Sequence, residues 1–176
     1  EIQYNGEVAG LTVEPISIAI IKGLLNRSID GVNMVNAPFI AKERGVEIQE
    51  SKSNEVHEYT STVQVQVTTQ NGTHRVTGSI FGKGDSRIVQ LEEYSLEAVL
   101  SKNMLVLNNT DVPGVIGNLG NVLGKHNLNI AGFHLGRMED GGKAVAIINI
   151  DGPPTQETVQ ELRETANIVN VHSVTL

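Results

Sequence analysis

The stretch that decides the fold is MLVLNNTDVPGVI, residues 104–116. Its first four residues are apolar and predict a strand over Met104–Asn108, which ends in a cluster of polar turn-forming residues. A Pro-Gly pair follows, and apolar residues then recur at helical spacing. The stretch therefore predicts a strand, a loop with exposed polar groups and the start of a helix.

The chain after this stretch predicts the order β-α-β-β-α-β. The expected elements are the strand Met104–Asn108, the helix Gly114–His126, the strands Asn129–Met138 and Lys143–Ile150, the helix Thr155–Asn167 and the strand Val169–Leu176. We expect the first helix to face inward with Ile116, Leu119, Val122 and Leu123, and Thr155 to cap the second. This order is ferredoxin-like, a fold shared by proteins of many functions.

The first half of the chain predicts a smaller sheet backed by two helices, Pro15–Asn26 and Met34–Gly45. Short strands are expected at Ile2–Tyr4, Glu7–Val13 and Val46–Glu50, followed by a polar loop over Ser51–Glu58. Strict alternation over residues 62–69 and the Asn71-Gly72 turn predict an antiparallel meander over Thr60–Leu91, whereas Glu92–Leu100 is ambiguous. The prediction is α+β, with domains at residues 1–100 and 101–176.

Composition limits the classes of partner. With 39% hydrophobic and only 3% aromatic residues the core is expected to be aliphatic, and a net charge of −7 argues against nucleic acid. There is no cysteine and no apolar run near the roughly 20 residues of a membrane span, so we expect a cytoplasmic protein without a membrane partner. The chain starts at Glu1 rather than Met, and we expect it to be a piece of a longer protein.

Three polar residues near the first helix are the candidate binding groups: Asn109, Asp111 and Asn129. An amino acid offers an ammonium group, which Asp111 can accept, and a carboxylate, which Asn129 and the backbone N–H groups of the helix start can bind. The alternative is that Asp111 and Asn129 are ordinary turn residues. The residues alone leave both open.

Other candidates are weaker. Gly114, Gly117, Gly120 and Gly124 form a stripe that indicates either tight helix-on-sheet packing or a nearby ligand, but they do not match the G-x-G-x-x-G pattern of a dinucleotide loop. Lys83 and Arg87 around a glycine turn indicate either an anion site or a solvated hairpin. No histidine pair has metal-ligand spacing and no acid, base or nucleophile set is apparent, so neither a metal nor catalytic residues are predicted, which argues against a hydrolase or isomerase.

Two longer segments resemble a known family. Residues 107–117 and 123–131 resemble the ACT domain signature, and Phe133–Arg137 with Gly141-Gly142 and residues 144–146 resembles the version found in D-3-phosphoglycerate dehydrogenases. In the first half, residues 35–38, 43–45 and 78–85 resemble the intervening domain of the long-form enzymes. The resemblance covers nearly the whole chain.

The resemblance implies the regulatory region of such an enzyme, with NAD and the catalytic residues in domains that this chain lacks. It implies no cofactor here and L-serine bound at an ACT dimer interface, in a homodimer or homotetramer. The implied serine site comprises Asn109, Asp111, Val112, Pro113, Gly114, Val115, Asn129 and Ile130. This chain departs from the family pattern at Asn109, Val112 and residues 92–94. The alternative is an ACT module that senses another amino acid or serves only in oligomerisation.

Overall fold

The computed structural model describes residues 1–176 except 57, 83 and 139–141. It divides into two compact units, Glu1–Arg75 and Val76–Leu176. Helices and largely antiparallel sheets are present together, which confirms the α+β prediction.

An antiparallel sheet was predicted for the first unit, but the observed sheet contains one parallel pair of strands. Strand β1 (Ile2–Gly6) pairs in parallel with β2 (Glu50–Ser53) and antiparallel with β3 (Ser61–Thr69). Strand β2 lies in the segment predicted as a polar loop, whereas the alternating Val46–Gln49 is irregular. Val46 and Ile48 remain exposed, so this alternation does not reflect a buried sheet face. Pairing of β2 with β1 overrides the local pattern.

The predicted strand Glu7–Val13 is wrong. A short 3-10 helix, η1 (Glu7–Gly10), follows β1 directly. Gly6 has a φ of +77°, and a Cβ at this position would lie 2.0 Å from the carbonyl oxygen of Thr60. The close approach of Thr60, the residue before β3, therefore requires glycine here.

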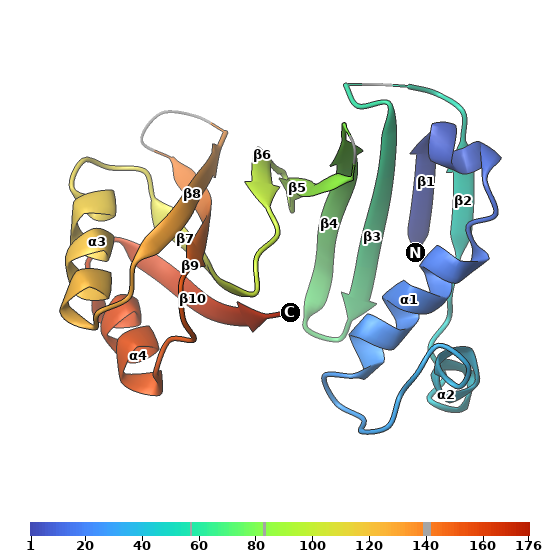
Figure 1. Ribbon diagram of the computed structural model, residues 1–176, viewed down its shortest axis with the longest axis horizontal. Coiled ribbons are helices and arrows are strands. Elements are labelled where there is room, and N and C mark those ends of the chain that lie inside the picture. The colour runs from blue at the N-terminus through green and yellow to red at the C-terminus, as the bar shows by residue number, and fades with distance from the viewer. Residues whose placement is uncertain (57, 83, 139–141) are drawn as a thin grey trace. The chain divides into compact units, whose positions relative to one another are not determined.

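Two helices accompany this small sheet, α1 (Glu14–Leu25) and α2 (Ala37–Glu43), and α2 packs against α1 (Figure 1). Each has proline in its first turn, as predicted. Tyr4 is fully buried, its hydroxyl lies 2.7 Å from that of Ser17 on α1, and burial raises its pKa. Helix α2 begins later than predicted because the side-chain oxygen of Asn33 accepts hydrogen bonds from the backbone of Val35 and Asn36 in the preceding turn.

The Asn71-Gly72 turn is confirmed. It leads from β3 into β4 (Gly72–Phe81), and Gly72 has a φ of +135°. Within the first unit the hairpin carries a 3.2 Å contact between the hydroxyls of Thr68 and Thr73.

In the second unit, β4 pairs antiparallel with β5 (Asp85–Leu91), and β5 pairs antiparallel with β6 (Tyr94–Val99). The ambiguous segment is therefore a strand. Its alternate residues Tyr94, Leu96 and Ala98 are buried.

The rest of the second unit has the predicted ferredoxin-like order. Its elements are β7 (Asn103–Thr110), α3 (Val115–Lys125), β8 (Ile130–Arg137), β9 (Lys143–Ile150), α4 (Gln156–Glu164) and β10 (Ile168–Thr175). The strands form one antiparallel sheet in the order β10-β7-β9-β8, and α3 and α4 cover one face of it (Figure 1). The core between them is aliphatic, with Leu107, Leu119, Leu123, Ile148 and Leu162 at most 1% exposed.

The second face of this sheet is covered by β6. Leu96 and Ala98 form a buried cluster with Met104 and Ile147. A Cβ on Gly136 of β8 would lie 2.9 Å from the carbonyl oxygen of Ser95, so the two strands touch. The compact units divide at Arg75 rather than at the proposed boundary of residue 100, which stays a prediction.

No described helix is both long and apolar enough to cross a membrane.

We expect Gly136→Ala to lower the free energy of unfolding by about 1–3 kcal/mol, because the new methyl group overlaps the backbone of β6. Gly120→Ala is the matched control. A Cβ there meets no atom within 4 Å, and alanine in a helix is favoured by about 0.5–1 kcal/mol over glycine. Urea denaturation followed by circular dichroism measures both. Equal effects of the two substitutions would contradict the close packing of β6 on β8.

Candidate functional site

The candidate site surrounds the loop of residues 111–114 between β7 and α3. Strand β7 is longer than predicted and includes Asn109 and Thr110. Asn109 lies opposite Ala144 of β9 and Ile168 of β10 and is only 4% exposed. Its amide nitrogen donates to the carbonyl oxygen of Thr110 at 2.9 Å. The side chain of Asn109 is thus buried, and its amide nitrogen is hydrogen-bonded within its own strand.

Asp111 is held at the edge of the sheet from two sides. Its backbone N–H donates to the carbonyl oxygen of Gly142 at 2.8 Å. Its carboxylate accepts a hydrogen bond from Arg137 at the end of β8, with 3.2 Å between Nη1 and Oδ2. The side chains are 21% exposed for Asp111 and 55% for Arg137.

Arg137 was not among the residues predicted from the sequence. The strand order places Arg137 near Asp111, because β7 and β8 are each antiparallel to β9 and so end at the same edge of the sheet.

The remaining predicted residues of the loop divide between core and surface. Val112 packs against the core and Val115 is only 2% exposed, while Pro113 and Gly114 are exposed. Ile116, predicted to face inward, is 53% exposed, so that expectation is wrong. The core face of α3 starts at Val115 instead and continues through Leu119.

Gly114 adopts the left-handed conformation, with a φ of +94°, and N-caps α3. The first turn of α3 consequently presents backbone N–H groups, which lack partners within the helix and favour an anion.

The glycine stripe of α3 is not explained by packing within the chain. A Cβ at Gly117, Gly120 or Gly124 would meet no atom within 4 Å among the described residues. Of the two alternatives left open by the sequence, tight packing against the sheet is therefore wrong. The stripe is an open, smooth surface of the helix.

Asn129 lies far from this loop within one chain. It precedes β8, is exposed, and donates from its amide nitrogen to Asp151 at 2.9 Å. Ile130 lies opposite Ile150, whereas Arg137 lies opposite Ala144, six residues away along β9. At about 3.3 Å per residue the two ends of β8 are separated by roughly 20 Å. One copy of the chain therefore does not bring the Asp111 loop and Asn129 together.

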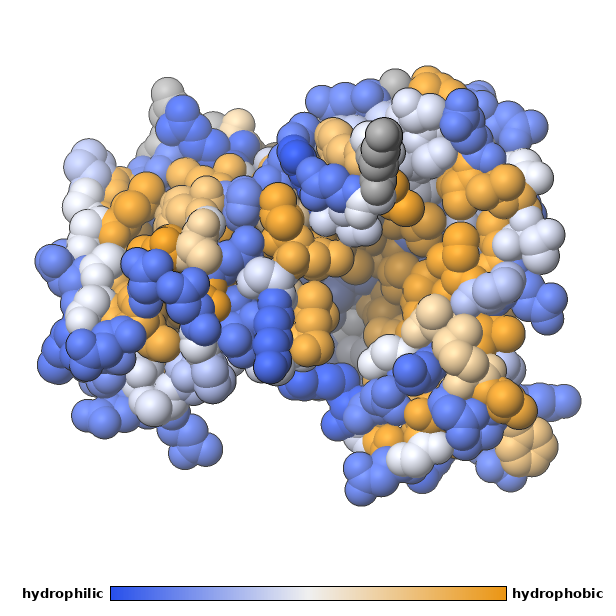
Figure 2. Space-filling model, viewed as in Figure 1, coloured by the Kyte–Doolittle hydropathy of each residue, from blue (hydrophilic) through white to orange (hydrophobic). Residues whose placement is uncertain are grey.

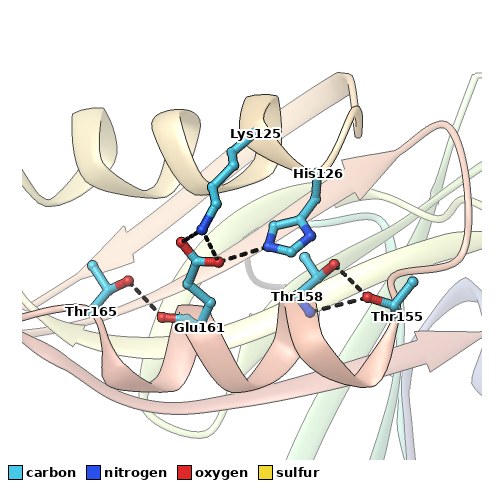
Figure 3. Close-up of polar contacts among 6 residues, drawn as sticks. All are labelled: Lys125, His126, Thr155, Thr158, Glu161 and Thr165. Carbon is cyan, nitrogen blue, oxygen red and sulfur yellow. Dashed lines mark hydrogen bonds and ion pairs between the residues drawn. The ribbon is translucent and has the colours of Figure 1, made fainter.

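An ion-pair cluster fixes the end of α3 against α4 (Figure 3). The carboxylate of Glu161 receives Lys125 Nζ at 2.8 Å on each oxygen, and His126 Nε2 lies 2.8 Å from one of them. Hydrogen bonds from Lys125 and His126 lower the pKa of Glu161, and the same contact raises the pKa of Lys125. Thr155 caps α4 as predicted, accepting from the backbone N–H of Thr158 at 3.1 Å.

The second predicted site, for an anion, is not open at Arg87. The guanidinium contacts Asp85 at 2.6 Å and Glu97 at 3.0 Å, and it lies 4.6 Å from the ring centroid of Phe81. These contacts, the one to Asp85 above all, raise the pKa of Arg87. An anion would have to displace two carboxylates, which favours the alternative of a structural hairpin. Lys83 lies outside the described residues.

A separate cavity of about 730 Å³ lies in the first unit. It is lined mainly by aliphatic side chains from α1, β3 and residues 45–49, among them Ile20, Leu24, Val46, Val65 and Val67. Figure 2 shows apolar side chains gathered on this unit over β3 and the facing side of α1. None of the predicted site residues lines the cavity. The described residues also contain no group of three His, Cys, Asp or Glu side chains able to hold a metal ion.

The fold and the open loop at the edge of the four-stranded sheet define a ferredoxin-like domain of the ACT class. Comparison with protein families agrees, since residues 103–167 match the ACT domain. Residues 1–92 match the D-3-phosphoglycerate dehydrogenase intervening domain. Because that match covers more than half of the chain, the chain belongs to the D-3-phosphoglycerate dehydrogenase family.

Individual relatives show the same pairing over the whole chain. A D-3-phosphoglycerate dehydrogenase of Synechocystis is 34% identical over 98% of this chain and 31% of its own length. That of Bacillus subtilis is 33% identical over 99% of this chain and 34% of its own length. The chloroplastic D-3-phosphoglycerate dehydrogenase 2 of Arabidopsis thaliana is 30% identical over 81% of this chain and 25% of its own length. The chain thus spans about a third of the length of the first of these relatives.

We expect Glu161→Gln to destabilise the second unit at neutral pH, because the ion-pair cluster loses its negative charge. The folded-state pKa of Glu161 lies below its ordinary value of 4.5, so its contribution is present above that value and is lost as the pH falls through the folded-state pKa. The difference in melting temperature between wild type and variant should therefore shrink below about pH 4.5. Glu164→Gln, on the same helix and hydrogen-bonded to Gln160 rather than to a cation among the described residues, is the control. A difference that stays constant with pH would contradict this role.

Proposed function

We propose that this chain is the regulatory region of a D-3-phosphoglycerate dehydrogenase and binds L-serine between two ACT domains for feedback control. The observation that carries the proposal is the separation of the two candidate groups. The Asp111 loop and Asn129 lie at opposite ends of β8, so a shared site needs two copies of the chain.

Strand β8 is suited to form that interface. It is the last strand in the order β10-β7-β9-β8 and pairs with β9 on one side. If two copies join antiparallel along β8, the end of one strand meets the start of the other. Asp111 and Arg137 then lie beside the partner's Asn129. The interface is isologous, so a homodimer carries two equal sites, and a second interface would give a homotetramer.

The groups that meet there suit a small amino acid. Asp111 provides a carboxylate for the ammonium group, the start of α3 provides backbone N–H groups, and the partner's Asn129 provides an amide. Pro113 and Gly114 leave the loop surface exposed. Val112 and Val115 hold the loop in place by packing into the core. Asn109 and Ile130 lie in strands β7 and β8, which position the neighbouring binding groups.

The contact between β6 and β8 offers a route for regulation. A ligand that favours one arrangement of paired β8 strands biases the position of β6, because Gly136 and Ser95 are in close contact. We propose that NAD and the 3-phosphoglycerate substrate bind in the part of the relatives that lies outside the matched third, and that this chain binds no cofactor.

We expect Asn129→Ala to weaken binding of L-serine at least tenfold, because the partner's amide contact is lost from both sites. Isothermal titration calorimetry measures the affinity, and Gln160→Ala on α4 is the control for a lost exposed amide. Equal affinity of wild type and Asn129→Ala would remove this residue from the site.

A panel of other amino acids, measured by thermal shift, distinguishes L-serine from another ligand. Dimerisation without any ligand response supports the purely oligomeric alternative.

We expect the isolated chain to show no oxidation of 3-phosphoglycerate with NAD, because we place the NAD and substrate sites in the part of the relatives that lies outside the matched third. NADH absorbance measures turnover, and calorimetry with NAD measures binding. Measurable turnover by the purified chain would contradict the assignment to a regulatory region.

A further inference from the structure

We propose that Arg137 binds the α-carboxylate of the ligand while Asp111 binds its ammonium group, so the site selects zwitterionic α-amino acids over hydroxy acids and amines. The inference rests on the proposed function and adds a binding residue to it. The Asp111–Arg137 ion pair would then be the ligand-free state of the site.

The two side chains have the right relation for this role. They come from the ends of two strands that point to the same edge of the sheet, and their charged groups lie 3.2 Å apart. The backbone of Asp111 is anchored to Gly142, and its side chain is short and only 21% exposed, while the longer Arg137 side chain is 55% exposed. An α-amino acid carries the complementary pair of charges on adjacent atoms. It can therefore insert between the two side chains and satisfy both.

The energy balance favours such an exchange. A partly exposed ion pair contributes little to stability, so opening the Asp111–Arg137 pair costs little. The ligand replaces one ion pair by two charge-assisted hydrogen-bonded contacts, and a guanidinium binds a carboxylate through two parallel N–H groups. A ligand without the amine leaves Asp111 facing another carboxylate. A ligand without the carboxylate leaves Arg137 facing an ammonium group.

The loop itself supplies no cation, since residues 111–114 read Asp-Val-Pro-Gly. Lys143 lies nearby, opposite Thr110 at the start of β9, but no contact joins it to Asp111 among the described residues. Arg137 is distinguished by its direct bond to Asp111. Antiparallel pairing of two copies along β8 would place the partner's Asn129 next to this guanidinium.

The test compares Arg137→Gln with Lys143→Gln, which removes the same charge from the same edge of the sheet. Calorimetry on the whole chain uses L-serine, 3-hydroxypropionate, which lacks the amine, and ethanolamine, which lacks the carboxylate. We expect wild type to prefer L-serine at least tenfold over both analogues. Arg137→Gln should lose at least tenfold in L-serine affinity and gain relative affinity for ethanolamine, while Lys143→Gln changes less than threefold. Asp111→Asn should do the converse and favour 3-hydroxypropionate.

Two results overturn the proposal separately from the function. If wild type binds L-serine but Arg137→Gln binds it equally well, or if Lys143→Gln loses as much as Arg137→Gln, then Arg137 is not the carboxylate contact although the domain is still a sensor. If wild type binds no amino acid, the proposed function itself fails. Melting temperatures of the variants within a few degrees of wild type confirm that each is folded. Arg137→Lys, which keeps the charge but not the two parallel donors, should retain part of the affinity.

Discussion

The hydrogen-bond register of β9 with its two neighbours determines where every candidate ligand group lies. Strand β9 is buried along Ala144–Ile150 and pairs with β7 on one side and β8 on the other. Both faces of β9 are buried, one against the helices and the other against β6, so a shift of one residue would exchange two differently packed faces and the register is strongly specified. The same register sets Arg137 beside the Asp111 loop and carries Asn129 to the far end of the sheet. The separation that makes a two-copy site necessary is thus a direct consequence of core packing.

Both faces of this sheet are covered, each by different elements. Helices α3 and α4 cover one face, and the Glu161 cluster joins the C-terminal end of α3 to α4. Strand β6 covers the other face through Leu96 and Ala98. Strand β8 therefore touches β6 through Gly136 while its ends carry Asn129 and Arg137. A single strand connects the candidate ligand groups with the element that precedes the ACT domain.

The order of elements in the second half, their bounds to within a few residues and the aliphatic core could be predicted because hydrophobic periodicity there agrees with tertiary packing. The first half was less predictable. Val46–Gln49 alternates yet forms no strand, whereas the polar Glu50–Ser53 does, because a strand at the edge of a sheet is held by backbone pairing. Within the site, Asp111 and Asn129 could be chosen from residue type. Arg137 could not, because its proximity to Asp111 arises from the sheet order, and Ile116 was misplaced by a one-residue error in helical phase.

The strand order has a consequence for how the domain is made. Strand β7 comes first in the ACT domain and lies inside the sheet, yet one of its neighbours, β10, comes last; Asn108 bonds to Asn170 across 62 residues. Such distant pairing slows folding, because a long loop must close before the contact is gained. During synthesis, one edge of β7 stays unpaired until the eight residues of β10 have been made. Premature termination within β10 would leave that edge open to other extended chains.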